Sequence, residues 1–367
     1  MKVLFVATVT VHIKAFHTPC LKWFKERGWE THVAALGQDE IPYCDVKYDV
    51  PFRRSPFSIS NIEAYFRLKD ILRRERFDII HCHTPMGGVL ARLCGKGQRK
   101  KGTRIIYTAH GFHFYKGAPM LNWLVYYPIE KWMSRHTDTL ITINREDYEL
   151  AKKKMKTKDI RYVPGVGVDT ERFTPSEESR KTARKNLDIA DNTVLVFSAG
   201  ELSPGKNHET AIRVIAKLND PNIRYCIAGE GKLEGYLNNL TQELKLNEKV
   251  IFLGFITNVS EWCSAADIFL FPSKREGLPV ALMEAMAAGL PCVVSGIRGN
   301  TDLIEQNKGG YLCDTQDIDA YVAAIKELAQ NENARAEMGE HNRNVMAKYD
   351  LSHVMKQMAD VYLAERA

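Results

Sequence analysis

The sequence predicts an α/β protein with two doubly wound domains, each built on a parallel β-sheet. Its 367 residues are many for one hydrophobic core and suit two. Short apolar runs alternate with longer amphipathic ones, which is the pattern of right-handed βαβ units. The alternation pauses at the Pro- and Gly-containing stretch 161–175 and then restarts, which indicates a second sheet.

The first half contains five expected strands and one clear helix. The strands read KVLFVATV, THVAAL, FDIIHCH, TRIIYTAH and DTLITIN in chain order. Between the second and third, residues 59–76 carry apolar side chains at helical spacing. We therefore expect an N-terminal domain over residues 1–170.

The second half repeats the pattern with the strands NTVLVFSAG, IRYCIAG, KVIFLG, DIFLFPS and PCVVSG. Segments 316–330 and 332–347 have helical patterns, and 350–365 suits a final helix. We expect a C-terminal domain over 171–347, and a helix within 348–367 that packs back on the first domain. Ligands of such sheets bind beyond the carboxyl ends of the strands, so the cleft between the domains is the expected site.

The composition is that of an ordinary globular protein, with 45% hydrophobic and 26% charged residues. No apolar run reaches the ~18 residues that span a bilayer. The opening MKVLFVATV fits a first strand better than a signal peptide. We expect a cytoplasmic protein.

The cysteines give no sign of disulfides or of a zinc site. None of the eight belongs to a C-x-x-C pair, and several lie in apolar runs, which favours reduced, buried thiols. His81 and His83, in the sequence HCH, share one face of an expected strand, but no third ligand lies nearby in sequence. We therefore predict no metal site.

The charge is distributed unevenly along the chain. Residues 1–170 contain 29 Lys and Arg against 17 Asp and Glu, a net of +12, and the remainder contains 22 against 28, a net of −6. A basic half suggests an anionic partner such as nucleic acid, a phospholipid surface or a phosphorylated substrate. A lysine-rich solvated surface is the alternative.

The loop after NTVLVFSAG is a candidate phosphate site. Gly200 ends the strand, and Lys206 precedes a helix, where a lysine and helix N–H groups can bind phosphate together. The loop lacks the Gly-Lys-Ser/Thr ending of a Walker A motif, so an ordinary surface lysine is the alternative. Gly229, Gly231 and Gly235 are spaced one residue too far for a dinucleotide fingerprint, which argues against an oxidoreductase.

The stretch SKREGLPVALMEAMAAGLP is the most informative in the chain. Gly277 and Leu278 offer N–H groups at a helix start, and Pro279 suits the first helical position. Glu276 precedes the helix, whereas Glu284 lies more than a turn inside an otherwise apolar one. A carboxylate there needs a partner, either ligand hydroxyls or, as the alternative, an arginine or a capping contact of the protein.

Four histidines are placed where a ligand could meet them. His110 leaves the carboxyl end of TRIIYTAH, and His113 follows it. His12 and His17 lie on the first loop and the following turn. Five-residue spacing does not put His12 and His17 on one helical face, so a shared role requires the chain to turn between them.

These features together resemble the GT-B glycosyltransferases, specifically glycosyltransferase family four. The resemblance covers nearly the whole chain, and its most specific element is the E-x7-E signature from Glu276 to Glu284. GELSPGKN, VIFLGF, WCSAADIFLFPS and YTAHGFHF fall in the family's order, and FVATVTVHIKAFHTP is similar to the bacterial exopolysaccharide and capsule branch. The fold it implies is two Rossmann-like domains that face an interdomain cleft.

The resemblance implies a retaining, metal-independent transferase that uses a nucleotide-sugar, with UDP preferred, and no cofactor. The implied catalytic residues are His110 and Glu276, both on the transferring sugar. The implied donor-binding residues are Gly200, Lys206, Leu253, Gly277, Leu278 and Glu284. Among these, Lys206 would contact the diphosphate, Glu284 the ribose, and the backbone near Leu253 the base. His12, Lys14, His17 and His113 remain as acceptor or cleft residues.

Two departures from the family matter for the phosphates. Many members carry Arg where this chain has Glu201, and many have a Gly-Gly where it has TVTVHIK, so Lys14 or backbone groups would have to substitute. The absence of an obvious nucleophile favours front-face attack, in which the acceptor hydroxyl enters beside the departing diphosphate. Asp317 and Asp319 begin a late helix and are expected to cap it rather than bind metal.

The basic, aromatic first half suits a lipid-linked acceptor. Residues 112–136 are rich in Phe, Tyr and Trp, and basic clusters lie at 73–76 and 96–104. We expect a peripheral surface for the inner face of the cell membrane and a polyprenyl-diphosphate-linked acceptor. A buried aromatic helix is the alternative. A GT-B nucleotide-sugar epimerase and a non-catalytic carbohydrate-binding protein remain as other functions, and no nucleic-acid partner is expected.

Overall fold

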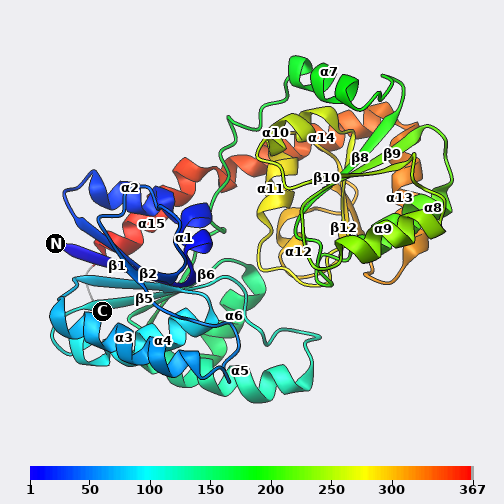
Figure 1. Cartoon of the computed structure of the whole chain (residues 1–367). Helices are drawn as coiled ribbons and strands as arrows, with labels where there is room; N and C mark the ends of the chain where they lie inside the picture. The colour runs from blue at the N-terminus through cyan, green and yellow to red at the C-terminus, as the bar shows by residue number, and fades with distance from the viewer. Residues whose placement is uncertain (365–367) are drawn as a thin grey trace. The chain divides into compact units, whose positions relative to one another are not determined.

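The computed structural model describes residues 1–364 and divides the chain into two compact units (Figure 1). Unit 1 comprises Met1–Val166 together with the chain from Val354 to the end of the described residues, and unit 2 is Gly167–His353. Each unit has its own parallel sheet with helices on both faces, as the sequence predicted. Within residues 1–364, no helix has both the length and the apolar character that crossing a bilayer requires.

Unit 1 contains a seven-stranded sheet in the order β3-β2-β1-β4-β5-β6-β7. Its strands are β1 (Lys2–Val9), β2 (Glu30–Leu36), β3 (Val46–Asp49), β4 (Ile79–His83), β5 (Arg104–Ala109), β6 (Thr139–Thr142) and β7 (Asp159–Tyr162). Its helices are α1 (Thr10–Phe16), α2 (Thr18–Lys25), α3 (Ser60–Arg74), α4 (Pro85–Arg99), α5 (Met120–Met133) and α6 (Arg145–Lys154), with the 3₁₀ turn η1 (Ser134–His136). All pairings in the sheet are parallel.

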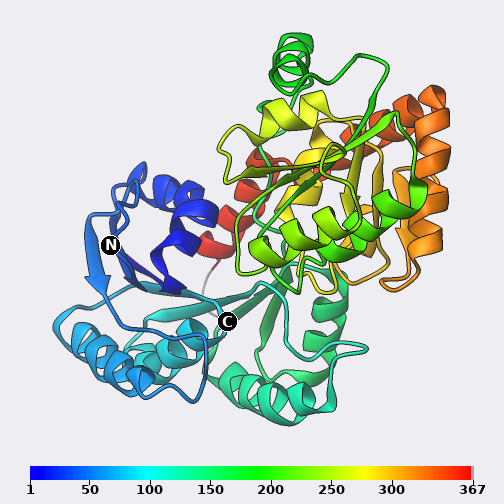
Figure 2. The same ribbon diagram turned by 45° about the vertical axis from the view of Figure 1, so that its right-hand side comes forward.

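The core of unit 1 lies on both faces of this sheet. Alternate residues of β1 point to opposite faces. Leu4 and Val6 pack in a cluster with α3 and α4, whereas Val3 and Phe5 pack in a cluster with α1, α2 and the C-terminal helix α15 (Leu351–Leu363). Figures 1 and 2 show α3 and α4 on one side of the sheet and α2 and α15 on the other. Because both faces are covered, the central strands are mostly apolar and do not alternate between apolar and polar residues.

Unit 2 contains a six-stranded sheet in the order β10-β9-β8-β11-β12-β13. Its strands are β8 (Val194–Ala199), β9 (Ile223–Ala228), β10 (Val250–Gly254), β11 (Ile268–Phe271), β12 (Cys292–Ser295) and β13 (Gly310–Cys313). Its helices are α7 (Glu177–Asn186), α8 (His208–Leu218), α9 (Glu234–Glu243), α10 (Val259–Ala265), α11 (Val280–Ala287), α12 (Asn300–Leu303), α13 (Ile318–Gln330) and α14 (Glu332–Met346), with the 3₁₀ turn η2 (Ala347–Tyr349).

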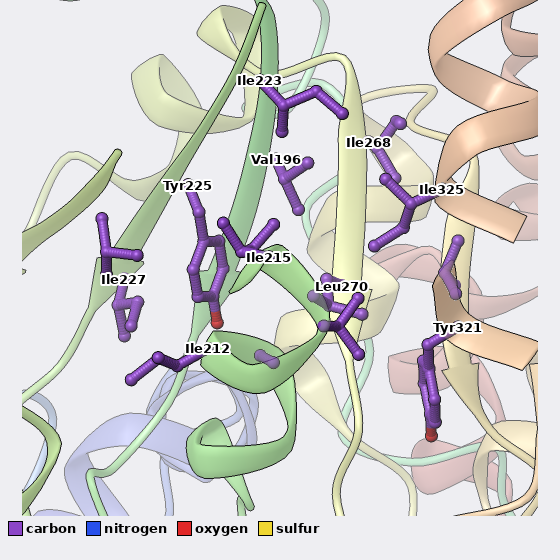
Figure 3. Close-up of a cluster of buried hydrophobic side chains, with 14 of the residues drawn as sticks. Val196, Ile212, Ile215, Ile223, Tyr225, Ile227, Ile268, Leu270, Tyr321 and Ile325 are labelled. Carbon is purple, nitrogen blue, oxygen red and sulfur yellow. The ribbon is translucent and has the colours of Figure 1, made fainter. Parts of the chain in front are cut away.

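One core cluster of unit 2 lies under α8, α9 and α13. Ile212 and Ile215 of α8 and Tyr321 and Ile325 of α13 pack with strand residues such as Tyr225 in one buried cluster (Figure 3). On the strands, α10 contacts β8, and α11 contacts β11 and β12. The two cores hold the carboxyl ends of the strands in place, and these ends position the candidate site.

Several local expectations need correction. His12 lies within α1 rather than on a loop, because that helix begins directly after β1. Pro279 is the residue before α11, with extended dihedral angles, and not its first residue. The edge strands β3, β7 and β13, of four residues each, were not predicted. The capping prediction for Asp317 is confirmed, since its carboxylate accepts a 3.0 Å hydrogen bond from the N–H of Ala320.

Candidate functional site

The first candidate site of unit 2 lies at the carboxyl ends of β8 and β11. These strands are hydrogen-bonded neighbours, so the loops that follow them start side by side. The loop after β8 carries Lys206, and the loop after β11 carries Glu276. The Lys206 ammonium donates a 2.7 Å hydrogen bond to a carboxylate oxygen of Glu276. The structure therefore brings together a predicted donor-binding residue and a predicted catalytic residue that are 70 positions apart in sequence.

Glycines at the strand ends leave room for the Lys206 side chain and its loop. Gly200 has a φ of +156°, and a Cβ atom built on it would lie 3.3 Å from carbons of the Lys206 side chain. The Lys206 ammonium lies 4.9 Å from the ring centroid of Phe271, a cation–π contact. A Cβ atom on Gly229 would lie 2.0 Å from the carbonyl oxygen of Gly200. Gly229 is thus explained by the packing of two strand ends.

The carboxylate of Glu284 has no hydrogen-bond partner among the residues that the structure describes. It lies in the middle of α11, partly buried, among buried residues such as Met283 and Ala285. Burial raises the pKa of Glu284 to about 7, and the positive charge of Arg172 opposes this shift. Among residues 1–364, no side chain or backbone N–H forms a hydrogen bond or ion pair with this carboxylate.

Glu130 provides a comparison from unit 1. It too lies on a helix that is mostly apolar, α5. Its carboxylate accepts two hydrogen bonds of 2.9 Å from the buried Arg92 guanidinium and one of 3.3 Å from the Tyr107 hydroxyl. A structural carboxylate in an apolar setting is therefore satisfied by the protein in this fold, and Glu284 is not.

The loop before α11 is held by a residue that the sequence did not single out. Arg298 is buried, and its Nε and Nη2 atoms each donate a 3.2 Å hydrogen bond to the backbone carbonyl of Glu276. Gly299, with a φ of +84°, lies so close that an added Cβ atom would be 2.5 Å from the carbonyl oxygen of Gly277. Gly277 and Leu278 lie in the loop just before Pro279, and the first N–H groups of α11, which begins at Val280, have no partner within the helix.

The remaining candidates of unit 2 lie nearby in the same sheet. Leu253 is in β10 and partly buried, and the carbonyl of the next residue, Gly254, accepts a 2.8 Å hydrogen bond from the N–H of Gly229. Glu201, where many relatives have arginine, is exposed directly after Gly200. The predicted ribose, diphosphate and base contacts therefore all belong to unit 2, as does Glu276, whereas His110, the other predicted sugar contact, belongs to unit 1.

Unit 1 contains a group of four side chains, His12, His17, His83 and His110, which we call the histidine cluster. One ring nitrogen from each lies within 4.8 Å of the others. The Nε2 atom of His12 is 3.4 Å from Nε2 of His17 and 3.4 Å from Nε2 of His110. The Nε2 atom of His110 is in turn 3.3 Å from Nδ1 of His83.

Neighbouring strands and a tight helix junction assemble the cluster. His83 ends β4, and His110 follows β5, which is paired with β4. His17 lies between α1 and α2, and the turn there brings its ring within a centroid distance of 5.2 Å of His12. His81, two residues before His83, bonds instead to the hydroxyls of Tyr362 (3.0 Å) and Thr108 (2.8 Å).

Burial keeps the histidine cluster uncharged at neutral pH. It lowers the pKa of His12 to about 4, with a further contribution from Arg54. It also holds the pKa values of His17, His83 and His110 well below 6.5, and the neighbouring histidines lower them further. The Nε2 atom of His83 is buried and has no hydrogen-bond partner.

A mostly apolar cavity of about 450 Å³ lies beside the cluster in unit 1. His12 and Thr84 line it near the strand ends, Tyr126 and Ile129 of α5 line another wall, and Arg54 supplies a positive charge. His113 also lines the cavity, with its ring centroid 4.6 Å from that of Tyr126. The size suits a small organic group rather than an ion.

Lys14 differs from the other predicted acceptor residues. It is exposed on α1 and is not among the residues that line this cavity. The pKa of Asp39 is lowered chiefly by a hydrogen bond from the Thr10 hydroxyl, and the charge of Lys14 contributes to a smaller extent. Arg54 was missed in the sequence, although the basic pair in FRRSP was a usable signal. No sequence pattern indicated Arg298, because its contact with the loop before α11 depends on which strands are neighbours in the sheet.

Comparisons with known proteins show which families this chain resembles. Residues 20–172 match the family model "Glycosyltransferase Family 4", and residues 179–345 match "Glycosyl transferases group 1". The chain is 42% identical over 368 residues to "Putative glycosyltransferase EpsD" of Bacillus subtilis (strain 168), covering 99% of this chain and 96% of that protein.

A more distant relative and a solved structure add further points. The chain is 28% identical over 314 residues to "UDP-Gal:alpha-D-GlcNAc-diphosphoundecaprenol alpha-1,3-galactosyltransferase" of Escherichia coli, covering 83% of this chain and 80% of that protein. The structure of HepE from Anabaena in complex with UDP-glucose has a TM-score of 0.82, at 16% identity and 99% coverage of both chains. The predicted GT-B fold is confirmed.

Proposed function

Since the chain belongs to the group 1 and family 4 glycosyltransferases, we propose that it transfers a sugar from a UDP-sugar to a hydroxyl of a lipid-linked glycan, in exopolysaccharide or capsule synthesis. The transfer would retain the anomeric configuration and use no metal ion on the donor. The name of the Escherichia coli relative, which pairs UDP-Gal with a diphosphoundecaprenol-linked acceptor, supports both the nucleotide and the acceptor class.

The observation that carries the donor site is the unpartnered carboxylate of Glu284. A partly buried carboxylate with its pKa raised to about 7 is costly in the folded protein. Two ribose hydroxyls would satisfy it by donating hydrogen bonds, which would offset this cost when the nucleotide binds. The Lys206 ammonium and the N–H groups at the start of α11 would hold the diphosphate.

The chemistry follows from these assignments. The bond from the anomeric carbon to the diphosphate oxygen breaks, and a bond to the acceptor oxygen forms on the same face. The acceptor proton passes to an oxygen of the departing diphosphate. Lys206 stabilises the charge that develops there, while Glu276 and His110 hold the hydroxyls of the transferring sugar. An uncharged His110, as its lowered pKa requires, suits a hydrogen bond to a sugar hydroxyl.

The cavity in unit 1 supports a lipid-linked acceptor. It is mostly apolar, and Arg54 beside it could meet a phosphate group. Large apolar side chains are also exposed in two segments of unit 1. They are Phe57, Ile59, Ile62 and Phe66 before and within α3, and Met120, Leu121, Leu124 and Trp132 on α5. Flotation with anionic liposomes at low and high salt tests this surface, and no binding at either salt would contradict it.

A thermal-shift panel tests the donor assignment. We expect UDP and UDP-sugars, but not GDP- or ADP-sugars, to raise the Tm of the wild-type chain, and Glu284→Ala to abolish that shift. Glu243→Ala removes an equal charge from the exposed surface of α9 and should leave the shift unchanged. A shift that survives in Glu284→Ala would overturn the ribose assignment.

Two product measurements test the rest of the proposal. Sugar transfer should persist in excess EDTA, and the anomeric coupling constant of the product should match that of the donor. Conversion of the UDP-sugar without any acceptor would instead indicate an epimerase.

A further inference from the structure

We propose that the histidine cluster binds one divalent transition-metal ion, with zinc as the best match, through one ring nitrogen from each of its four members. The cluster belongs entirely to unit 1, whereas Lys206, Glu276 and Glu284 belong to unit 2. Binding of the proposed ion does not depend on the proposed function.

The spacing of the nitrogens matches a tetrahedral site. Zinc binds imidazole nitrogens at about 2.0–2.1 Å, which in a tetrahedron places ligand atoms about 3.3–3.4 Å apart. The three measured contacts between cluster nitrogens are 3.4, 3.4 and 3.3 Å. All four ligand atoms lie within 4.8 Å of one another, so a small movement of the rings would complete the shell.

Hydrogen bonding accounts for the same contacts poorly. A nitrogen of a neutral imidazole either carries a proton and donates or has a lone pair and accepts, but never both. The Nε2 atoms of His12 and His110 each face two other ring nitrogens. At each of these two atoms, a single proton or a single lone pair would therefore have to serve two contacts. If each of the four rings instead directs one lone pair at a common ion, every nitrogen has a single partner.

The chemistry of the ligand set decides which ions would fit. Ligand sets made only of imidazole suit zinc, copper and nickel, whereas magnesium and calcium require oxygen ligands. The site should therefore discriminate strongly between these two groups of ions.

The rings are held in place by the surrounding fold. The His83 ring is stacked against Phe5, at a centroid distance of 5.8 Å and an interplanar angle of 13°, and against His17, at 3.7 Å and 26°. His83 can present either nitrogen, since Nδ1 faces His110 and Nε2 is buried without a partner. A preformed, buried ligand set loses little conformational entropy when it binds an ion.

The test is a titration of the full-length chain, without a polyhistidine tag and after treatment with EDTA. Cobalt(II) should bind with one ion per chain and give the visible absorption of a tetrahedral site, without the near-ultraviolet charge-transfer band of thiolate ligands. Zinc should displace the cobalt, and magnesium should not. Absence of binding, or a thiolate band from any of the eight cysteines, would overturn the proposal.

Matched variants locate the ion. His12→Gln changes a partly exposed member, and it should weaken cobalt binding by more than about tenfold, while His83→Gln should do the same or more. His32→Gln is the control, because His32 is a buried histidine of unit 1 that bonds to Glu30 and Tyr48 outside the cluster. Equal binding by the wild type and by a folded His12→Gln variant would also overturn the proposal.

A second arm rests on the proposed function. A bound ion would occupy the His110 nitrogen that is assigned to the transferring sugar, so zinc should inhibit transfer in the wild type and EDTA should restore it. Inhibition without cobalt binding would count against the metal site. Cobalt binding without any transferase activity would count against the proposed function instead.

Discussion

The Lys206 ammonium and the Glu276 carboxylate form a 2.7 Å ion pair at the carboxyl ends of two neighbouring strands. Their side chains are only 25% and 11% exposed. Such a pair is neutral as a unit and fixes the position of both groups. A diphosphate that binds Lys206 must therefore share it with Glu276, which would place the sugar hydroxyls assigned to Glu276 beside the diphosphate.

The first prediction concerns Lys206. Lys206→Ala should weaken UDP binding by about tenfold or more, since a charge-assisted hydrogen bond contributes about 1.5–3 kcal/mol. It should also lower kcat, because the charge on the leaving diphosphate is no longer stabilised. Isothermal titration calorimetry with UDP checks the affinity. Lys274→Ala removes an exposed lysine from the neighbouring loop and should change neither quantity; equal losses in both variants would contradict the assignment.

The second prediction concerns the pH dependence that Glu284 imposes on stability. The folded-state pKa of about 7 exceeds the ordinary value of 4.5, so the folded protein holds this proton more tightly than the unfolded chain. The wild type therefore loses stability as the pH rises from about 4.5 through about 7, in total about 3 kcal/mol. In Glu284→Gln the side chain is an uncharged amide, so the variant lacks this loss of stability with rising pH.

The measurement is the Tm of Glu284→Gln relative to the wild type at two pH values. The variant should gain several degrees more at pH 8 than at pH 5, even though it should bind UDP less tightly. The same Tm difference at both pH values would show that the Glu284 carboxylate is not destabilising.

The third prediction concerns the buried pair of Arg92 and Glu130. Arg92→Met leaves Glu130 charged and unpaired in an apolar setting, which should lower the free energy of unfolding by about 3–5 kcal/mol. Urea denaturation measures this loss, and adding Glu130→Met to the first substitution should restore most of it. The exposed pair of Arg67 and Glu63 is the control, since Arg67→Ala should cost at most about 1 kcal/mol.

The fourth prediction concerns Gly299. An alanine there would adopt a positive φ of +84° and place its Cβ atom 2.5 Å from the carbonyl oxygen of Gly277. Gly299→Ala should therefore displace the loop before α11, and should lower both the Tm and the affinity for UDP. A Cβ atom added at Gly235 would have no neighbour within 4 Å. Gly235→Ala should therefore leave the Tm and the UDP affinity unchanged, or raise the Tm slightly. Full UDP affinity in Gly299→Ala would show that this loop tolerates the shift.

The sequence predicted the architecture well where strands are buried on both faces. The run IIHCH in β4 is an example, because a short, mostly apolar segment between two helical patterns is typical of a central parallel strand. It failed for β3, β7 and β13, whose four residues each lie at sheet edges and include polar side chains such as Lys47 and Arg161. There, pairing with the neighbouring strand decides the structure, and local sequence does not.

In the candidate site too, local sequence could identify some residues, whereas others come together only through the fold. Glu276 and Glu284 could be singled out together because they lie on one short segment. The histidine cluster could not, because it needs the order β1-β4-β5 to bring His12, His83 and His110 together from positions up to 98 residues apart. The partner of Glu130 was hidden for the same reason, since Arg92 lies on a different helix.

The return of α15 to unit 1 determines how this chain can be divided. Val354, Met358, Val361 and Tyr362 complete the core that contains Val3 and Phe5, and His81 and Arg104 bond to Tyr362. Unit 1 is therefore discontinuous in the gene, whereas unit 2 is one uninterrupted insert between residues 166 and 354. A fragment that stops at residue 166 would expose an apolar sheet face to water. Only a chain in which the last helix is spliced onto the first 166 residues through a new linker could yield unit 1 on its own.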